Sequence, residues 1–193
     1  MGVSCGDVVT ELWRSMRPDV FDMRVDLLEL MHHQNCMDLR KLVLEAIAHG
    51  SDQRSPFLHA SKSFEIVRRK YWQNSQVQHA ALCIVKIDIN KWDGRLGDFP
   101  CEGWTAQKMC IDMSSPEKQL EFFRTDDVKA FGGQQGDFQY LRGAQKDEEV
   151  LIKWRGCVPI SIMSVVDPTD GTVVEPFLDF IQRETWRQSL DTW

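Results

Sequence analysis

The segment from Ala80 to Ile89 constrains the fold most, because it reads as a β-strand along its whole length. Its sequence is rich in β-branched residues and alternates between apolar and charged side chains near its end. Helical patterns occur on both sides of it at irregular intervals, so strands and helices mix without a regular β-α-β alternation. We therefore predict an α+β fold rather than a doubly wound parallel sheet.

Periodicity and capping residues predict five helices and six strands. Asp38, for example, is placed to cap a helix that Gly50 ends. The predicted helices are residues 7–16, 38–50, a segment capped by Ser63 that includes Tyr71, 115–123 and 176–190. The predicted strands are residues 20–25, 57–61, 80–89, 108–113, 149–152 and 160–166. Residues 93–103 and 132–136 are predicted loops, and residues 167–171 a turn.

The length of the chain, 193 residues, fits one domain with short extensions. We predict a helical extension over residues 1–17, a central domain over residues 18–168 and a C-terminal helix over residues 169–193. A domain of this size buries enough surface to fold without disulfides or metal ions.

The charge balance argues against one class of partner. The chain has 23 Lys and Arg residues against 29 Asp and Glu residues, which gives a formal net charge of -6. Broad binding to phosphate backbones needs clustered Lys and Arg, so we expect no specific nucleic-acid binding. No run approaches the roughly 20 apolar residues that a membrane span needs.

Six cysteines lie at positions 5, 36, 83, 101, 110 and 157, and none forms a Cys-x-x-Cys pair. Without a secretory signal at the start, free thiols are the simplest interpretation. We therefore expect the protein in the cytoplasm or another reducing compartment.

Two common kinds of catalytic site find little support in the sequence. His32, His33 and Cys36 cluster, but adjacent histidines point to different faces of an element and no second paired cluster completes a zinc site. The chain also has no Gly-x-Ser-x-Gly nucleophile motif. We predict no metal site.

A third set of residues depends on its order along the chain. Arg24 ends the first predicted strand, a segment rich in Ser and His runs from Ser55 to Ser63, and Asp147 and Glu149 open a late strand. Transfer of a sugar from a pyridinium leaving group needs such parts. A cation binds phosphate or ribose, a rigid strand shapes the pocket, and a carboxylate stabilises the oxocarbenium ion.

At these residues the sequence resembles the ADP-ribosyltransferase-like superfamily, in its Arg-Ser-Glu branch. That branch has an Arg on its first strand, a Ser-Pro-Phe-x-Ser-Thr-Ser strand and a carboxylate-x-Glu pair opening a late strand. The corresponding segments here are Phe21–Arg24, Ser55–Ser61 and Asp147–Ile152, and the stretches Ile87–Lys91 and Cys110–Ser114 are also similar to such domains.

The resemblance implies a core of two small packed sheets surrounded by helices, with a cleft between them. It implies NAD as the substrate and a protein acceptor as a partner. Arg24 would bind the NAD phosphate or ribose, His59 and Ser61 would shape the nicotinamide pocket, Glu149 would act on the ribose, and Asp147 would orient the acceptor.

The sequence departs from the family pattern at two of these segments. His59 and Ala60 replace the first Ser and the Thr of the Ser-Thr-Ser element, and Met23-Arg24-Val25 lacks the usual aromatic-Arg-Gly setting. Three hypotheses stay open. The domain transfers ADP-ribose, or it is a catalytically inactive interaction or regulatory module of the same fold, or it is an unrelated α+β protein. Either of the first two hypotheses requires that residues 57–61 lie beside residues 149–152 in the sheet.

Overall fold

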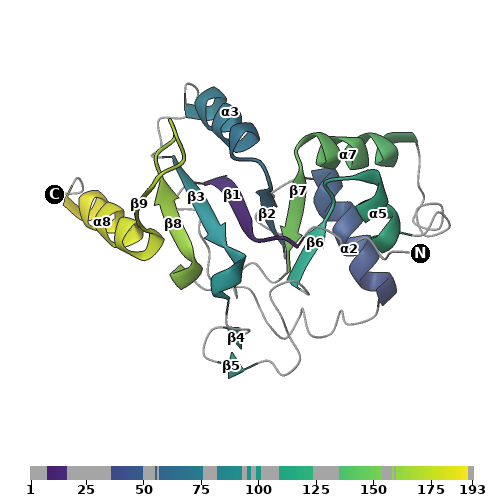
Figure 1. Cartoon of the computed structure of the whole chain (residues 1–193), viewed down its shortest axis with the longest axis horizontal. Coiled ribbons are helices and arrows are strands. Elements are labelled where there is room, and N and C mark those ends of the chain that lie inside the picture. The colour runs from purple at the N-terminus through teal and green to yellow at the C-terminus, as the bar shows by residue number, and fades with distance from the viewer. Residues whose placement is uncertain are drawn as a thin grey trace.

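The computed structural model describes residues 8–16, 36–49, 55, 57–75, 82–92, 95–96, 99–100, 109–123, 135–153, 158 and 160–190. Its centre is a seven-stranded sheet in the order β6-β7-β2-β1-β3-β8-β9, and all its neighbouring strands pair antiparallel (Figure 1). The strands are β1 (Glu11–Met16), β2 (Leu58–Ser61), β3 (Cys83–Asp88), β6 (Cys110–Asp112), β7 (Glu149–Ile152), β8 (Met163–Val166) and β9 (Val173–Pro176). The fold is therefore mixed α+β, as the sequence predicts.

The expectation of two packed sheets is wrong. β1 pairs with β3 along six residue pairs on one side, and on its other side it meets β2 through the single pair Trp13 and Ser61. One strand thus joins both halves into one continuous sheet. A separate two-stranded sheet, β4 (Arg95–Leu96) and β5 (Phe99–Pro100), lies apart from it within the segment predicted as a loop (Figure 1).

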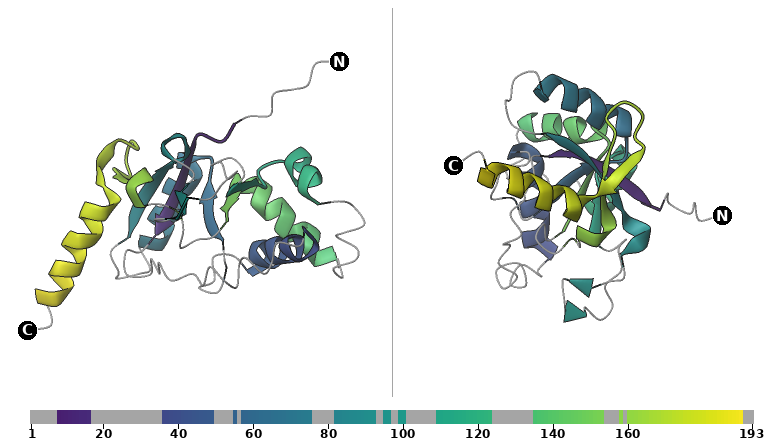
Figure 2. Two further views of the ribbon diagram at one scale, coloured as in Figure 1. Left: turned by 90° about the horizontal axis from the view of Figure 1, so that it is seen from below. Right: turned by 90° about the vertical axis from the view of Figure 1, so that its left-hand side faces the viewer.

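The helices cover the sheet in groups that follow its side-chain alternation. Apolar residues on one face of β2, β3, β7 and β8 pack with the start of α8, whereas alternate residues pack with α3 or with α2 and α7. Figure 2 shows α8 running from the sheet edge away from the body of the molecule. The helices are α2 (Cys36–His49), α3 (Phe64–Ser75), α5 (Pro116–Phe122), α7 (Gln135–Lys146) and α8 (Phe177–Leu190), with 3-10 turns η2 (Ile89–Lys91) and η4 (Ile160–Ile162).

The helix predicted over residues 7–16 is wrong, because Glu11–Met16 forms the strand β1. Leu12 and Met16 lie four residues apart, a spacing that puts them on one face of a strand as well as of a helix. Leu12 packs in the cluster on one side of the sheet and Trp13 in a cluster on the other. Because β1 is covered on both faces, its apolar residues do not alternate, and residues 11–16 belong to the sheet rather than to an extension.

Helix α7 is the other large difference from the prediction. Gln135 and Gly136 belong to it, although Gly132 to Gly136 was expected to form a loop. Its sequence contains two glycines, which lower its helix propensity. Of its described side chains only Leu141 and Ala144 are buried. The strand predicted over residues 160–166 begins only at Met163, after η4. The strand predicted over residues 20–25 lies outside the described residues.

The remaining predicted elements are confirmed within a few residues. The strand over residues 149–152 has the predicted bounds. Helix α5 begins after Ser115, whose hydroxyl accepts a hydrogen bond from the backbone N–H of Lys118. Helices α2, α3 and α8 and strands β2, β3 and β6 likewise lie within or near their predicted ranges.

Two free thiols lie in the described sheet. Cys83 is buried in β3, and Cys110 is partly buried in β6. Burial raises the pKa of both thiols to about 12, so both stay protonated at neutral pH.

Gln119 is a buried polar side chain that connects three segments near α7. Its Nε2 donates to the carbonyl oxygens of Met113, at 2.9 Å, and Leu141, at 2.8 Å. Its Oε1 accepts from Nε2 of Gln145 at 2.7 Å. The amide therefore ties α5 and the end of β6 to α7, the helix that leads to β7.

We expect Gln119→Met to lower the free energy of unfolding by about 2–3 kcal/mol, because it leaves two buried carbonyls and one amide without these partners. Urea denaturation measures the change. The control is Glu121→Met, at an exposed position of the same helix, which should change stability by less than about 0.5 kcal/mol. Equal effects of the two substitutions would contradict the assignment.

Candidate functional site

The ladder between β2 and β7 forms the base of the candidate site. It pairs His59 with Leu151 and Ser61 with Glu149. Directly paired residues of two antiparallel strands project from the same face of the sheet. Three sequence-predicted residues, His59, Ser61 and Glu149, therefore share one face, and the condition that residues 57–61 lie beside residues 149–152 is met.

His59 and Glu149 contact each other directly. Nδ1 of His59 lies 2.5 Å from Oε1 of Glu149, and both side chains are largely buried. The carboxylate accepts the hydrogen of the ring nitrogen, so each side chain holds the other in one orientation. On the far side of the ring, Nε2 of His59 lies 3.4 Å from Oγ of Ser55.

The contacts from Ser55 to His59 and from His59 to Glu149 resemble those of a Ser-His-carboxylate triad. However, Ser55 does not line the cavity that His59 and Glu149 face. Its Oγ also accepts the backbone N–H of Phe57 at 3.3 Å. Ser55 therefore orients the imidazole rather than facing a substrate.

The hydroxyl of Ser61 makes two hydrogen bonds to backbone groups, one as donor and one as acceptor. Its Oγ donates to the carbonyl oxygen of Asp147 at 2.7 Å and accepts the N–H of Ser63 at 3.1 Å. The next residue, Lys62, donates its backbone N–H to the carbonyl oxygen of Glu148. These bonds fix the end of β2 against the turn that precedes Glu149.

The side chain of Asp147 pairs with a residue that no sequence motif indicated. Nζ of Lys70, on α3, lies 2.6 Å from Oδ2 of Asp147, and both side chains are partly exposed. Asp147 thus lies near Glu149 in the same cavity but is held by a different element.

Glu148 has a left-handed backbone, with φ of 48°, and it is the single described non-glycine residue with positive φ. It ends α7: its N–H donates to the carbonyl of Gln145, and the N–H of Asp147 donates to that of Gly143. Glycine usually occupies such a position after a helix. Here a strained residue stands between the two candidate carboxylates.

Arg14 is a site residue that the sequence interpretation missed. It lies on β1, lines the cavity, and donates from Nη1 to the carbonyl oxygen of His59. Arg24, the predicted arginine, lies outside the described residues. Assigning residues 7–16 to a helix excluded Arg14, although the preceding Trp13 supplies the aromatic residue that the setting of Arg24 lacks.

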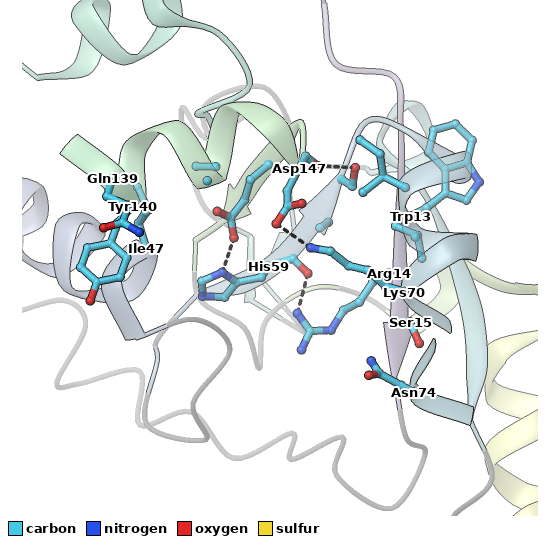
Figure 3. A pocket seen from close by; sticks show the side chains of 17 residues that line it. Trp13, Arg14, Ser15, Ile47, His59, Lys70, Asn74, Gln139, Tyr140 and Asp147 are labelled. Atoms are coloured by element: carbon cyan, nitrogen blue, oxygen red, sulfur yellow. Dashed lines mark hydrogen bonds and ion pairs between the residues drawn. The ribbon is translucent and has the colours of Figure 1, made fainter. Parts of the chain in front are cut away.

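The cavity has a volume of about 540 Å³ and lies between α3 and α7, over β1, β2 and the start of β7. In Figure 3, Arg14, His59, Lys70 and Asp147 occupy its middle, Gln139 and Tyr140 lie on one side, and Trp13 on the other. Its walls consist of Trp13, Arg14 and Ser15; Ile47; His59, Ala60 and Ser61; Ile66, Val67, Lys70 and Asn74; Gln139, Tyr140, Gly143 and Ala144; Asp147 and Glu149.

No protein-family model, curated protein or solved structure matches this chain. Among the described residues, no group of three or more His, Cys, Asp or Glu side chains is placed to hold a metal ion. No helix in the described ranges is both long and apolar enough to cross a membrane.

The strain at Glu148 is testable. We expect Glu148→Gly to raise the free energy of unfolding by about 0.5–1 kcal/mol, because glycine adopts positive φ without the steric penalty of a side chain. Thermal and urea denaturation measure the change. In contrast, Arg69→Gly in the exposed middle of α3 should lower stability by about 1 kcal/mol. Destabilisation by both glycines would disprove the assignment of strain.

Proposed function

We propose that the chain is an NAD-binding mono-ADP-ribosyltransferase-like domain that transfers ADP-ribose to an acceptor. The observation that carries this proposal is the convergence of Glu149, His59 and Arg14 on one cavity. These side chains come from three strands that are neighbours in the sheet but distant in the sequence. A carboxylate and a guanidinium that face the same cavity suit a cationic transition state and an anionic diphosphate, respectively.

In this proposal Arg14 takes the role that the sequence interpretation gave to Arg24. The resemblance requires an arginine on the first strand, and β1 is the first strand among the described residues. A guanidinium offers a planar fork of N–H donors that matches phosphate oxygens. Its bond to the carbonyl oxygen of His59 places this fork next to the pair formed by His59 and Glu149.

The reaction breaks the bond between C1′ of the ribose and N1 of nicotinamide. The leaving nicotinamide takes the bonding electrons, and positive charge develops on the ribose. The Glu149 carboxylate stabilises that charge and binds the ribose, while His59 holds the carboxylate in place. The acceptor, oriented by Asp147, then attacks C1′ and loses its proton to solvent water.

The dimensions and chemistry of the cavity suit NAD. Its volume of about 540 Å³ lies within the range of roughly 300–1,000 Å³ typical of small-molecule sites. Tyr140 and Trp13 add aromatic surface at opposite ends of it, and such surface suits flat rings.

The free thiols of Cys83 and Cys110 support a reducing compartment such as the cytoplasm.

One observation favours the second candidate, a catalytically inactive module of the same fold. The hydroxyl of Ser61 is already bonded to the carbonyl oxygen of Asp147, and the imidazole of His59 covers one oxygen of Glu149. In such a module NAD or another ligand binds without release of nicotinamide. Measuring nicotinamide release therefore distinguishes the inactive module from the transferase.

We expect Glu149→Gln to lower the rate of nicotinamide release from NAD at least about 100-fold, because the amide removes the negative charge that stabilises the oxocarbenium ion. Auto-modification with labelled NAD should fall in parallel. Chromatography of released nicotinamide and radiolabel on the protein measure the two activities.

The matched control is Glu148→Gln, which removes the same charge from the exposed neighbouring residue and should stay within about twofold of the parent. If the parent binds NAD but releases no nicotinamide, the domain is the inactive module. If the parent neither binds nor cleaves NAD, both candidates fail for this ligand.

The assignment of the arginine makes a separate prediction. We expect Arg14→Lys to weaken NAD binding about tenfold or more, because lysine cannot bind phosphate oxygens in a bidentate manner. Arg24→Lys should bind NAD like the parent. Isothermal titration with NAD measures both affinities, and a loss confined to Arg24→Lys would restore the original assignment.

A further inference from the structure

Asp147 is the second carboxylate of the cavity, and it already has a cationic partner. Its Oδ2 lies 2.6 Å from Nζ of Lys70, and side-chain exposures of 36% and 46% place the pair at the solvent-facing side of the cavity. The more buried carboxylate, Glu149, is paired with His59 instead. The cavity therefore holds a more exposed carboxylate that is paired with Lys70 and a more buried one that contacts His59.

The position of Lys70 follows from the packing of α3. Val67 anchors this helix in the cluster with Ile84 and Val166. At its start, Oγ of Ser63 accepts the N–H of Ile66. Lys70 and Asn74, four residues apart, then share the face of α3 that lines the cavity. The ammonium is thus held over Asp147 by a helix packed on the sheet.

We propose that Lys70 masks Asp147 and thereby excludes cationic acceptors, so that the acceptor is an uncharged nucleophile, such as a hydroxyl group of a protein side chain. This proposal rests on the proposed function and identifies its acceptor class. Lys70 is a specificity residue in this scheme, since it acts through Asp147 and touches none of the reacting atoms.

The physical argument compares two acceptors. A guanidinium or ammonium group that binds Asp147 must displace Lys70 from Oδ2 or bind beside it, and in both cases it lies near a second cation of like charge. Arg14 adds a further positive charge to the same cavity. A hydroxyl group bears no such cost. It attacks C1′, and the hydroxyl proton passes to solvent water as the new C–O bond forms, while nicotinamide departs with the electrons of the broken C–N bond.

The pair can be removed without threatening the fold, because ion pairs between partly exposed side chains contribute little to stability. Lys70→Met keeps most of the length and the apolar stem of the side chain but removes its charge. Lys70→Arg keeps the charge. The double variant Lys70→Met/Asp147→Asn removes both charges, and Arg69→Met removes a neighbouring exposed charge that does not line the cavity.

The first experiment titrates each protein with agmatine, a small guanidine, and measures affinity by calorimetry. We expect Lys70→Met to bind agmatine about tenfold more tightly than the parent, because Asp147 is then unmasked. The Lys70→Arg, Arg69→Met and double variants should bind it as weakly as the parent. Equal affinity of the parent and Lys70→Met, or tight binding by the double variant, would overturn the masking.

The second experiment adds NAD and follows the products. The parent should release nicotinamide and modify uncharged side chains, such as those with hydroxyl groups, without forming ADP-ribosyl-agmatine. Mass spectrometry of the auto-modified chain identifies the modified residues, and modification of Arg or Lys residues by the parent would overturn the proposal. Lys70→Met should form that adduct at least about tenfold faster than the parent. Adduct formation by the parent at the same rate as by Lys70→Met would overturn the proposal. If no protein releases nicotinamide, the proposed function fails and the uncharged acceptor with it, while the titration still decides whether Lys70 excludes cations.

Discussion

The antiparallel ladder between β2 and β7 is the interaction on which the site depends. It brings together His59 and Glu149, which are 90 residues apart in the sequence, and sets their register through four residue pairs. A shift of this register by one residue would move Glu149 to the opposite face of the sheet, where apolar side chains pack with α8. The contacts around the ladder hold this register. Ser61 bonds to the carbonyl of Asp147, and the buried amide of Gln119 steadies the helix that delivers β7.

The cavity lies where the two halves of the sheet meet. β1 pairs fully with β3 but touches β2 at one residue pair, and the helices on that face belong to one half or the other. α3 covers the half that contains β1 and β3, whereas α2 and α7 cover the half that contains β2 and β7 (Figure 1). The cavity between them combines an arginine and a lysine from one half with two carboxylates and a histidine from the other. Each carboxylate of the cavity has its own partner, since Glu149 contacts His59 and Asp147 pairs with Lys70.

Several elements were predictable because their signals are local. Helix α2 has apolar residues at helical spacing, although it begins at Cys36, before the predicted cap Asp38, and β7 is a short apolar run that includes two β-branched residues. His59, Ser61, Asp147 and Glu149 were found from the order of their segments. The prediction failed for β1, whose coverage on both faces removes the alternation that marks an exposed strand, and for that reason Arg14 was not among the predicted site residues. It also failed for α7, because its two glycines lower the helix propensity of its sequence and the first of them, Gly136, belongs to a glycine-rich stretch that is typical of a loop.

The sequence by itself determined the α+β class, the short polar segment of β2 and the carboxylates that open β7, because these features depend on residues adjacent in the chain. The tertiary structure decided that the sheet is continuous, that Arg14 lines the cavity, and that Lys70 pairs with Asp147. Lys70 and Asp147 are 77 residues apart, and no local pattern connects them. Their contact exists because α3 packs on β1 and β3 while Asp147 follows the last turn of α7. Pairing across such distances follows from how helices pack on a shared sheet.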